Sequence, residues 1–91
     1  MINLTNYYKD EINDTLRERN LLFEIAEIYQ VYTGADGFVY IEAMTYEEKY
    51  LVITIGRYVF DIKRFKTQRA AMEQFKTIID NSTKEALGNT E

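Results

Sequence analysis

The feature that most constrains the fold is a two-residue alternation of side chains through the middle of the chain. Over residues 38–43, aliphatic side chains alternate with aromatic and charged ones, and residues 50–55 and 58–62 repeat this period. Because successive side chains of a strand point to opposite faces of a sheet, the alternation predicts three consecutive strands. Their short connections favour antiparallel pairing, so we predict a meander at the centre of the chain.

Glycine-containing segments mark the turns of this meander. The pair Asp36-Gly37 suits a turn that requires a positive φ. Gly56-Arg57 matches a two-residue type II′ hairpin loop, in which glycine takes the first position. With that loop, we predict that Tyr58, Phe60 and Ile62 share one face of the last strand.

Residues 21–32 are ambiguous between a strand and a helix. Phe23 and Ile25 alternate as in a strand, whereas other apolar residues of the segment also fit a helical stripe. We favour a strand with a bulge near Ala26, because Ile, Val, Phe and Tyr dominate the segment and a glycine turn follows. The alternative is one long first helix followed by a three-stranded sheet.

Helical periods flank the alternating region. Residues 4–19 carry apolar side chains at steps of four and predict a helix that ends near Asn20. From Thr67 onward the period is helical again, with an apolar stripe on one side and charged residues on the other. Arg69 and Glu73 form an i,i+4 pair on the charged side.

These elements predict an α+β fold made of an N-terminal helix, an antiparallel four-stranded meander and a C-terminal helix packed on one sheet face. Residues 1–80 form a single domain in this prediction, because a chain of 91 residues holds one core. Residues 81–91 are polar, and we predict a frayed tail there. We expect the helices on one face and the other face of the sheet open.

The residue types missing from the chain exclude most catalytic mechanisms. The chain contains no His and no Cys, and its single serine is Ser82. Ser-His-Asp and Cys-His mechanisms are therefore excluded, and no imidazole or thiolate is available to bind a transition metal. We predict that the protein is not an enzyme and has no catalytic residue, cofactor or metal ion.

The first predicted helix carries a line of carboxylates. Asp10, Asp14 and Glu18 follow one another at steps of four and share a helix face. Clustered carboxylates can bind Mg²⁺ or Ca²⁺, but magnesium normally shares them with a phosphate, and the sequence has no phosphate-binding loop. We interpret these residues as a solvated helix face whose repulsion is relieved by Lys9 and Arg17.

The sequence gives no indication of export or membrane insertion. Residues 1–10 lack the basic and apolar regions of a signal peptide. No apolar run approaches the roughly 18 residues of a membrane-spanning helix. We therefore expect a cytoplasmic protein without a membrane segment.

Tyrosine is in surplus, with eight residues in the chain. We expect Tyr8 and Tyr58 in the core, but a small domain cannot bury all eight. Tyrosine is enriched at interface hot spots because it offers a large contact area at low entropic cost. The predicted open sheet face and its hairpin form a candidate partner-binding surface made of Tyr40, Glu42, Tyr46, Glu47, Glu48 and Tyr50. The alternative is ordinary cross-strand aromatic pairing on an exposed sheet.

Charge is divided along the chain, whose net charge is −4. Residues 1–56 contain four basic and ten acidic residues, whereas residues 57–76 contain six basic and two acidic ones. A basic segment of this kind can follow a phosphate backbone. The alternative nucleic-acid-binding residues are Arg57, Lys63, Lys66 and Arg69. The sequence pI of about 4.8 disfavours direct binding to nucleic acid.

These observations favour a non-enzymatic binding protein whose acidic, tyrosine-rich surface docks on a basic patch of a larger protein, such as a nucleic-acid enzyme. In size, acidity and helix-meander-helix order, the chain resembles the small inhibitors carried by phages and mobile elements, including anti-CRISPR proteins. That resemblance implies an inhibitor or a nucleic-acid mimic and transfers no site residue. Two alternatives are a structural or regulatory homodimer that pairs sheet edges or open faces, and a nucleic-acid accessory protein that uses the basic segment.

Overall fold

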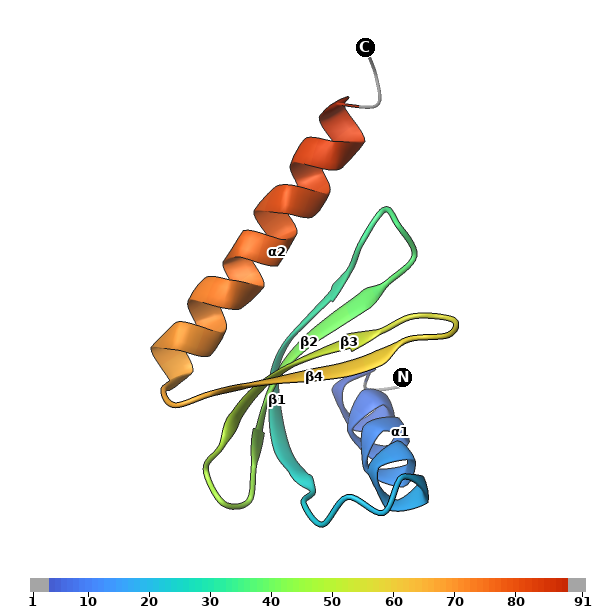
Figure 1. Ribbon diagram of the computed structural model, residues 1–91, viewed down its shortest axis with the longest axis vertical. Coiled ribbons are helices and arrows are strands. Elements are labelled where there is room, and N and C mark those ends of the chain that lie inside the picture. The colour runs from blue at the N-terminus through green and yellow to red at the C-terminus, as the bar shows by residue number, and fades with distance from the viewer. Residues whose placement is uncertain (1–3, 89–91) are drawn as a thin grey trace.

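The computed structural model describes residues 4–88. Its four strands form one antiparallel sheet in the order β1-β2-β3-β4, preceded by one helix and followed by another (Figure 1). The elements are α1 (Leu4–Glu18), β1 (Ile25–Thr33), β2 (Val39–Thr45), β3 (Tyr50–Ile55), β4 (Phe60–Phe65) and α2 (Gln68–Gly88). The predicted α+β fold with an antiparallel meander is confirmed.

A Schellman motif ends α1 where the sequence predicts its end. Asn20 takes the left-handed conformation, with φ of 60°. The Asn20 N–H donates to the Arg17 carbonyl at 3.0 Å, and the Leu21 N–H donates to the Leu16 carbonyl at 2.9 Å. These two bonds satisfy the last carbonyls of the helix and turn the chain away from its axis. The alternative of one long first helix is therefore wrong.

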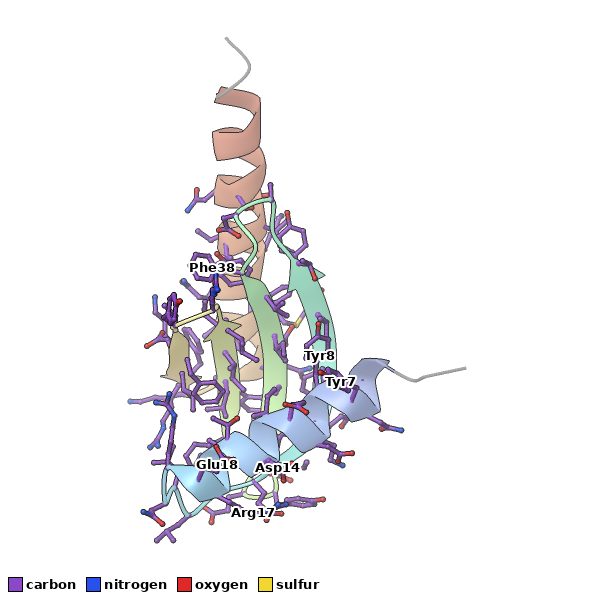
Figure 2. All side chains as sticks on the ribbon, turned by 90° about the vertical axis from the view of Figure 1, so that its right-hand side faces the viewer. Tyr7, Tyr8, Asp14, Arg17, Glu18 and Phe38 are labelled. Atoms are coloured by element: carbon purple, nitrogen blue, oxygen red, sulfur yellow. The ribbon has the colours of Figure 1, made fainter. Side chains whose placement is uncertain are left out.

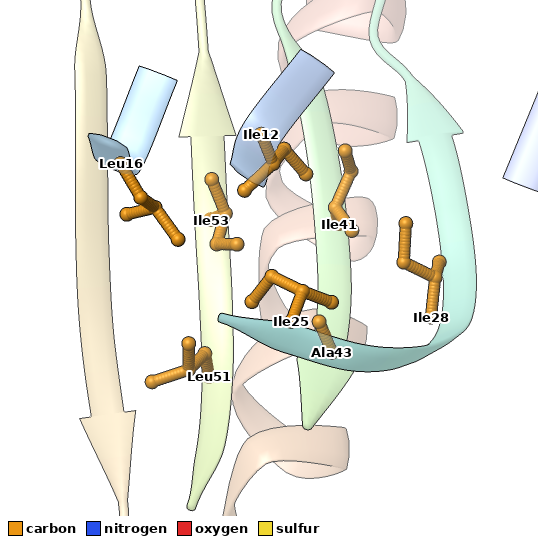
Figure 3. Packing of buried hydrophobic residues seen from close by; sticks show 8 residues of the cluster. All are labelled: Ile12, Leu16, Ile25, Ile28, Ile41, Ala43, Leu51 and Ile53. Carbon is orange, nitrogen blue, oxygen red and sulfur yellow. The ribbon is translucent and has the colours of Figure 1, made fainter. Parts of the chain in front are cut away.

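β1 begins at Ile25 and is held there by a buried side chain of α1. Asn13 accepts a hydrogen bond from the Ile25 N–H at 2.7 Å and donates one to the Ile25 carbonyl at 3.3 Å. The pairing register of β1 shifts between Ile25 and Glu27, which confirms the predicted bulge near Ala26. The bulge bends the strand, so that Ile25 and Ile28 both reach the core beneath α1 (Figure 3).

The helices lie on opposite faces of the sheet, α1 on one and α2 on the other (Figure 2). Beneath α1, the first core consists of buried aliphatic side chains (Figure 3): Ile12, Leu16, Ile25, Ile28, Ile41, Ala43, Leu51 and Ile53. Beneath α2, the second core contains buried Val52, Ala71 and Phe75, with half-buried aromatic rings around them.

The prediction that one face of the sheet is open is therefore wrong. β2 and β3 carry large side chains on both faces, as Ile53 and Val52 illustrate, and each face needs its own cover. α1 covers the first face, and the chain enters α2 on the other. The face that carries Tyr40 and Glu42 consequently lies beneath α2.

The β3–β4 turn differs by one residue from its predicted position. The Gly56 N–H donates to the Val59 carbonyl at 2.8 Å, so the two loop residues are Arg57 and Tyr58. Gly56 has no positive φ, and the predicted type II′ turn is wrong. Glycine is needed there for another reason, because a Cβ at Gly56 would overlap the Phe38 ring. Tyr58 lies at the loop tip with 88% of its surface exposed, not in the core.

α2 is longer than the apolar stripe of the sequence indicates. Its first turn is capped by Thr67, whose hydroxyl accepts a hydrogen bond from the Ala70 N–H at 3.1 Å. The helix continues to Gly88, so residues 81–88 of the predicted tail are helical. No proline interrupts this segment, and glycine is a common residue at helix ends. Residues 89–91 lie outside the described residues. Within residues 4–88, neither helix has the length and apolar character needed to cross a bilayer.

Candidate protein-binding surfaces

The β2–β3 turn holds three of the predicted partner-binding residues at the surface: Tyr46, Glu47 and Glu48. Thr45 fixes this turn through backbone hydrogen bonds with Lys49 and Glu48, each 3.0 Å long. The Thr45 hydroxyl also accepts a hydrogen bond from the Lys49 N–H at 3.1 Å. Tyr46 is 67% exposed. A hydrogen-bonded backbone thus presents an aromatic side chain and two carboxylates to solvent.

A second segment lies beside this turn. The Tyr46 N–H donates to the Glu24 carbonyl at 3.4 Å, and both segments lie at the lower end of the molecule in Figure 1. In this segment Leu21 is 37% exposed and Leu22 is 98% exposed. Single exposed apolar residues are ordinary, but here three of them come from two neighbouring segments. We call these residues the hairpin-end surface: Leu21, Leu22, Glu24, Tyr46, Glu47 and Glu48.

A pocket of about 250 Å³ adjoins the hairpin-end surface. Phe23, Leu51 and Phe65 form its apolar walls, and Glu47 and other polar residues complete the lining. The Arg64 guanidinium also lines the pocket and lies 5.1 Å from the centre of the Phe23 ring. Such an apolar hollow can receive an aliphatic or aromatic side chain from a partner.

The other three predicted partner-binding residues are on the sheet face beneath α2. Tyr40 and Tyr50 are half-buried and pack against the second core. The Tyr40 hydroxyl donates to the Asp36 carboxylate at 2.9 Å, and its ring stacks on Tyr32 with 6.3 Å between ring centres. The prediction that Tyr40, Glu42 and Tyr50 share one sheet face is correct, but that face is covered. The reason is the position of α2, which the alternation of side chains does not reveal.

Glu42 is the most unusual of these residues, because its side chain is only 1% exposed. One carboxylate oxygen accepts a hydrogen bond from the Gln30 amide at 2.7 Å. Among the described residues, the other oxygen, Oε2, has no hydrogen-bond partner. Removing a carboxylate from water is unfavourable unless both oxygens are paired. Glu42 is therefore a buried polar group on a face that is otherwise rich in tyrosine.

The basic residues of the alternative prediction are exposed but spread apart. Arg57 precedes β4 and Lys66 follows it, and a six-residue strand spans about 20 Å. The Arg57 guanidinium lies 5.5 Å from the centre of the neighbouring Tyr58 ring. Arg69 makes the predicted pair with Glu73, at 3.4 Å. Lys63, on β4, lines a different pocket from Arg69. These four cations do not form one compact patch.

The carboxylates of α1 lie on its exposed side (Figure 2). Arg17 pairs with Asp14 at 2.7 Å, and its Nε lies 3.6 Å from a Glu24 oxygen. Arg17 thus links the acidic face of α1 to the hairpin-end surface. Among the side chains that the structure describes, no group of three carboxylates lies close enough together to hold a metal ion.

The sequence prediction missed Leu21 and Leu22 as surface residues. An apolar run from Leu21 to Phe23 is typical of a strand or a buried helix, and we placed it in a strand. The helix end near Asn20 was predicted, but the residues that follow it form a loop, and β1 begins only at Ile25.

The titration of Tyr29 is clearly perturbed. Burial raises the pKa of its hydroxyl above 10.0, and the carboxylate of Glu27 raises it further. The hydroxyl donates to the Met44 sulfur at 3.3 Å. Tyr29 therefore stays neutral at ordinary pH and acts as a packing residue.

Comparison of the chain with protein families, curated proteins and solved structures finds no match.

Proposed function

We propose that this protein is a non-enzymatic inhibitor or regulator that acts in the cytoplasm. Its hairpin-end surface docks on a basic surface of a larger nucleic-acid-binding protein. The observation that carries the proposal is the joining of two exposed segments by the hydrogen bond between Tyr46 and Glu24. This bond brings exposed apolar residues and carboxylates to one end of the molecule.

The composition of this surface supports docking on a protein. Interface hot spots are enriched in tyrosine, which fits exposed Tyr46, and a rim of polar residues commonly excludes water around them. Leu22 exposes 98% of its surface and gains most from being covered. The adjoining pocket of about 250 Å³ offers a place for a side chain of the partner.

The charge of this surface supports a basic partner. Glu24, Glu47 and Glu48 belong to it, and the acidic face of α1 lies next to it through Arg17. Complementary charge raises the rate of encounter and suppresses wrong partners. A protein that binds nucleic acid carries such a basic surface for its phosphates. Docking there places carboxylates where phosphates would lie, which is competitive inhibition.

The proposal is tested by affinity capture with matched variants. The Leu22→Ser, Tyr46→Ser double variant removes the apolar centre of the hairpin-end surface. Tyr58→Ser is the control, because Tyr58 is exposed at another turn, between β3 and β4. We expect the wild type and the control to retain the same host protein. The double variant should bind this protein at least about tenfold more weakly.

The captured host protein is then tested for nucleic-acid binding in the presence and absence of the small protein. We expect saturating amounts of the small protein to weaken that binding, and a Glu47→Lys, Glu48→Lys variant to lose the effect. Equal loss of partner binding in the Tyr58→Ser control would contradict the proposed surface. Unchanged nucleic-acid binding by the captured protein would contradict competitive inhibition.

A further inference from the structure

A groove beside α2 takes no part in the proposed docking surface. It has a volume of about 410 Å³ and lies between one side of α2 and Gln30 of β1. α2 makes its main contacts with β2, β3 and β4, so its side toward β1 remains accessible. Met72, Phe75 and Ile79 give the groove an apolar lining, and Met72 is 47% exposed. Surface of this kind fits an amphipathic helix.

The charged residues along this side of α2 alternate in sign. Arg69, Glu73, Lys76 and Asp80 follow at spacings of four, three and four, which keeps them on one helix face together with Met72. All four are exposed. Arg69, Glu73 and Lys76 line the groove itself.

This order of charges is self-complementary in one orientation. If a second α2 lies antiparallel, with a two-fold axis between Gln74 and Phe75, each Arg69 lies opposite Asp80 of the other copy. Each Glu73 then lies opposite Lys76 of the other copy. A parallel pair in the same register would instead place every charge opposite its own like charge. The sequence of α2 thus favours an antiparallel copy of itself over a parallel one.

We propose that α2 is a dimerisation helix and that the groove beside it receives the α2 helix of a second copy, in antiparallel orientation. At the centre of the contact, Met72 of each copy packs on the apolar wall of the other copy's groove. The Arg69–Asp80 and Glu73–Lys76 pairs between the copies set the register. The contact uses no residue of the hairpin-end surface. Each dimer therefore presents two such surfaces, which raises the avidity for a repetitive partner.

The first measurement is the molar mass in solution as a function of concentration. We expect light scattering to give twice 10.8 kDa at high concentration and to fall toward the monomer on dilution. Glu73→Lys alone places a lysine opposite Lys76 of the other copy, twice per dimer. Lys76→Glu alone places a glutamate opposite Glu73 of the other copy, also twice. We expect each variant to raise the dimer dissociation constant about tenfold.

The decisive measurement is an equimolar mixture of these two variants. In the mixed dimer, the introduced lysine of one copy faces the introduced glutamate of the other, and the second pair is the native Lys76 with the native Glu73. We expect the mixture to form dimers with an affinity close to that of the wild type. This rescue cannot arise from misfolding of either variant, and circular dichroism of each variant alone provides the check on the fold.

Three results would overturn the proposal: a wild type that is monomeric at all concentrations, single variants that dimerise like the wild type, or a mixture without rescue. The second result would indicate pairing through another surface, such as the edges of the sheet. The Leu22→Ser, Tyr46→Ser variant should keep the wild-type mass. The molar mass therefore tests dimerisation, and affinity capture tests partner docking, so that either proposal can fail without the other.

Discussion

The two faces of the sheet bury polar groups in opposite ways. Beneath α1 the core is aliphatic, and its buried Asn13 uses both its amide nitrogen and its oxygen to bind the backbone of Ile25. Beneath α2 the core is aromatic, and buried Glu42 leaves one carboxylate oxygen without a partner among the described residues. Both polar atoms of the buried amide on the first face have a hydrogen-bond partner, whereas one oxygen of the buried carboxylate on the second face has none among the described residues.

The composition of the second face explains why the sequence prediction treated it as exposed, since tyrosine and glutamate are common at protein surfaces. A tyrosine ring can be buried while its hydroxyl reaches a hydrogen-bond acceptor, as Tyr40 does with the Asp36 carboxylate and Tyr29 with the Met44 sulfur. An aromatic and acidic strand face is therefore compatible with a core. The face beneath α1 is aliphatic, and its burial follows from its composition. The following variants test how far the two faces differ.

Leu16→Ala tests the aliphatic face and has the largest expected effect. Leu16 is fully buried in the first core, and a leucine deleted at such a site leaves a cavity. We expect the free energy of unfolding to fall by about 2–5 kcal/mol, measured by urea denaturation. Tyr58→Ala, at the exposed β3–β4 turn, is the control and should change the free energy of unfolding by less than about 0.5 kcal/mol. Similar losses in both variants would show that Leu16 does not lie in a tightly packed core.

Asn13→Ala tests whether the paired amide stabilises the first face. The substitution leaves the Ile25 N–H and carbonyl without their partners at the start of β1. We expect the free energy of unfolding to fall by about 1–3 kcal/mol. Glu11→Ala, on the exposed side of the same helix, should have little effect. An unchanged free energy of unfolding in Asn13→Ala would show that the paired amide does not stabilise the first face, and the two faces would then not differ as described.

Glu42→Met tests the uncompensated group on the second face. Methionine has a similar shape and carries no charge, and Gln30 is exposed enough to bind water in place of the carboxylate. We expect the free energy of unfolding to rise by about 1–3 kcal/mol. Glu47→Met, on the exposed β2–β3 turn, provides the matched control. A destabilised Glu42→Met variant would mean that the carboxylate is compensated after all.

Tyr29→Phe gives the smallest expected effect and tests burial at β1. Because the pKa of Tyr29 in the folded state is raised above 10.0, the folded protein retains this proton more tightly than the unfolded chain does. The stability from this group is complete below pH 10 and is lost as the pH rises through the folded pKa. We therefore expect the wild type to lose more stability above about pH 10 than Tyr29→Phe does. Parallel stability curves in this range would contradict the burial of the hydroxyl.

The elements of the fold were predictable because local chemistry determines them. The helix end near Asn20 and the bulge near Ala26 both lie where the pattern indicates, and Gly37 takes the positive φ expected of its turn, at 87°. The β3–β4 turn was not predictable in this way. Gly56 is required by the Phe38 ring, which approaches it from the start of β2, and not by the turn itself.

The candidate binding surface was predictable only in part. Tyr46, Glu47 and Glu48 lie in a short polar connection between two strands, and such connections are at the surface in almost any fold. Glu42 lies within a strand, where exposure depends on what covers the face. Leu22 was missed because an exposed leucine looks like a core residue until the chain around it is folded.

By itself, the sequence determined the order of the elements, the antiparallel pairing and the side of each helix that must be buried. The periodicity of apolar side chains and the choice of turn residues depend on residues close together in the chain, so these properties can be predicted from the sequence. Only the tertiary structure decided which face of the sheet each helix covers. β2 and β3 have large side chains on both faces, so neither face is marked as the outer one. That choice buries Glu42, and it leaves the hairpin-end surface and the groove beside α2 exposed.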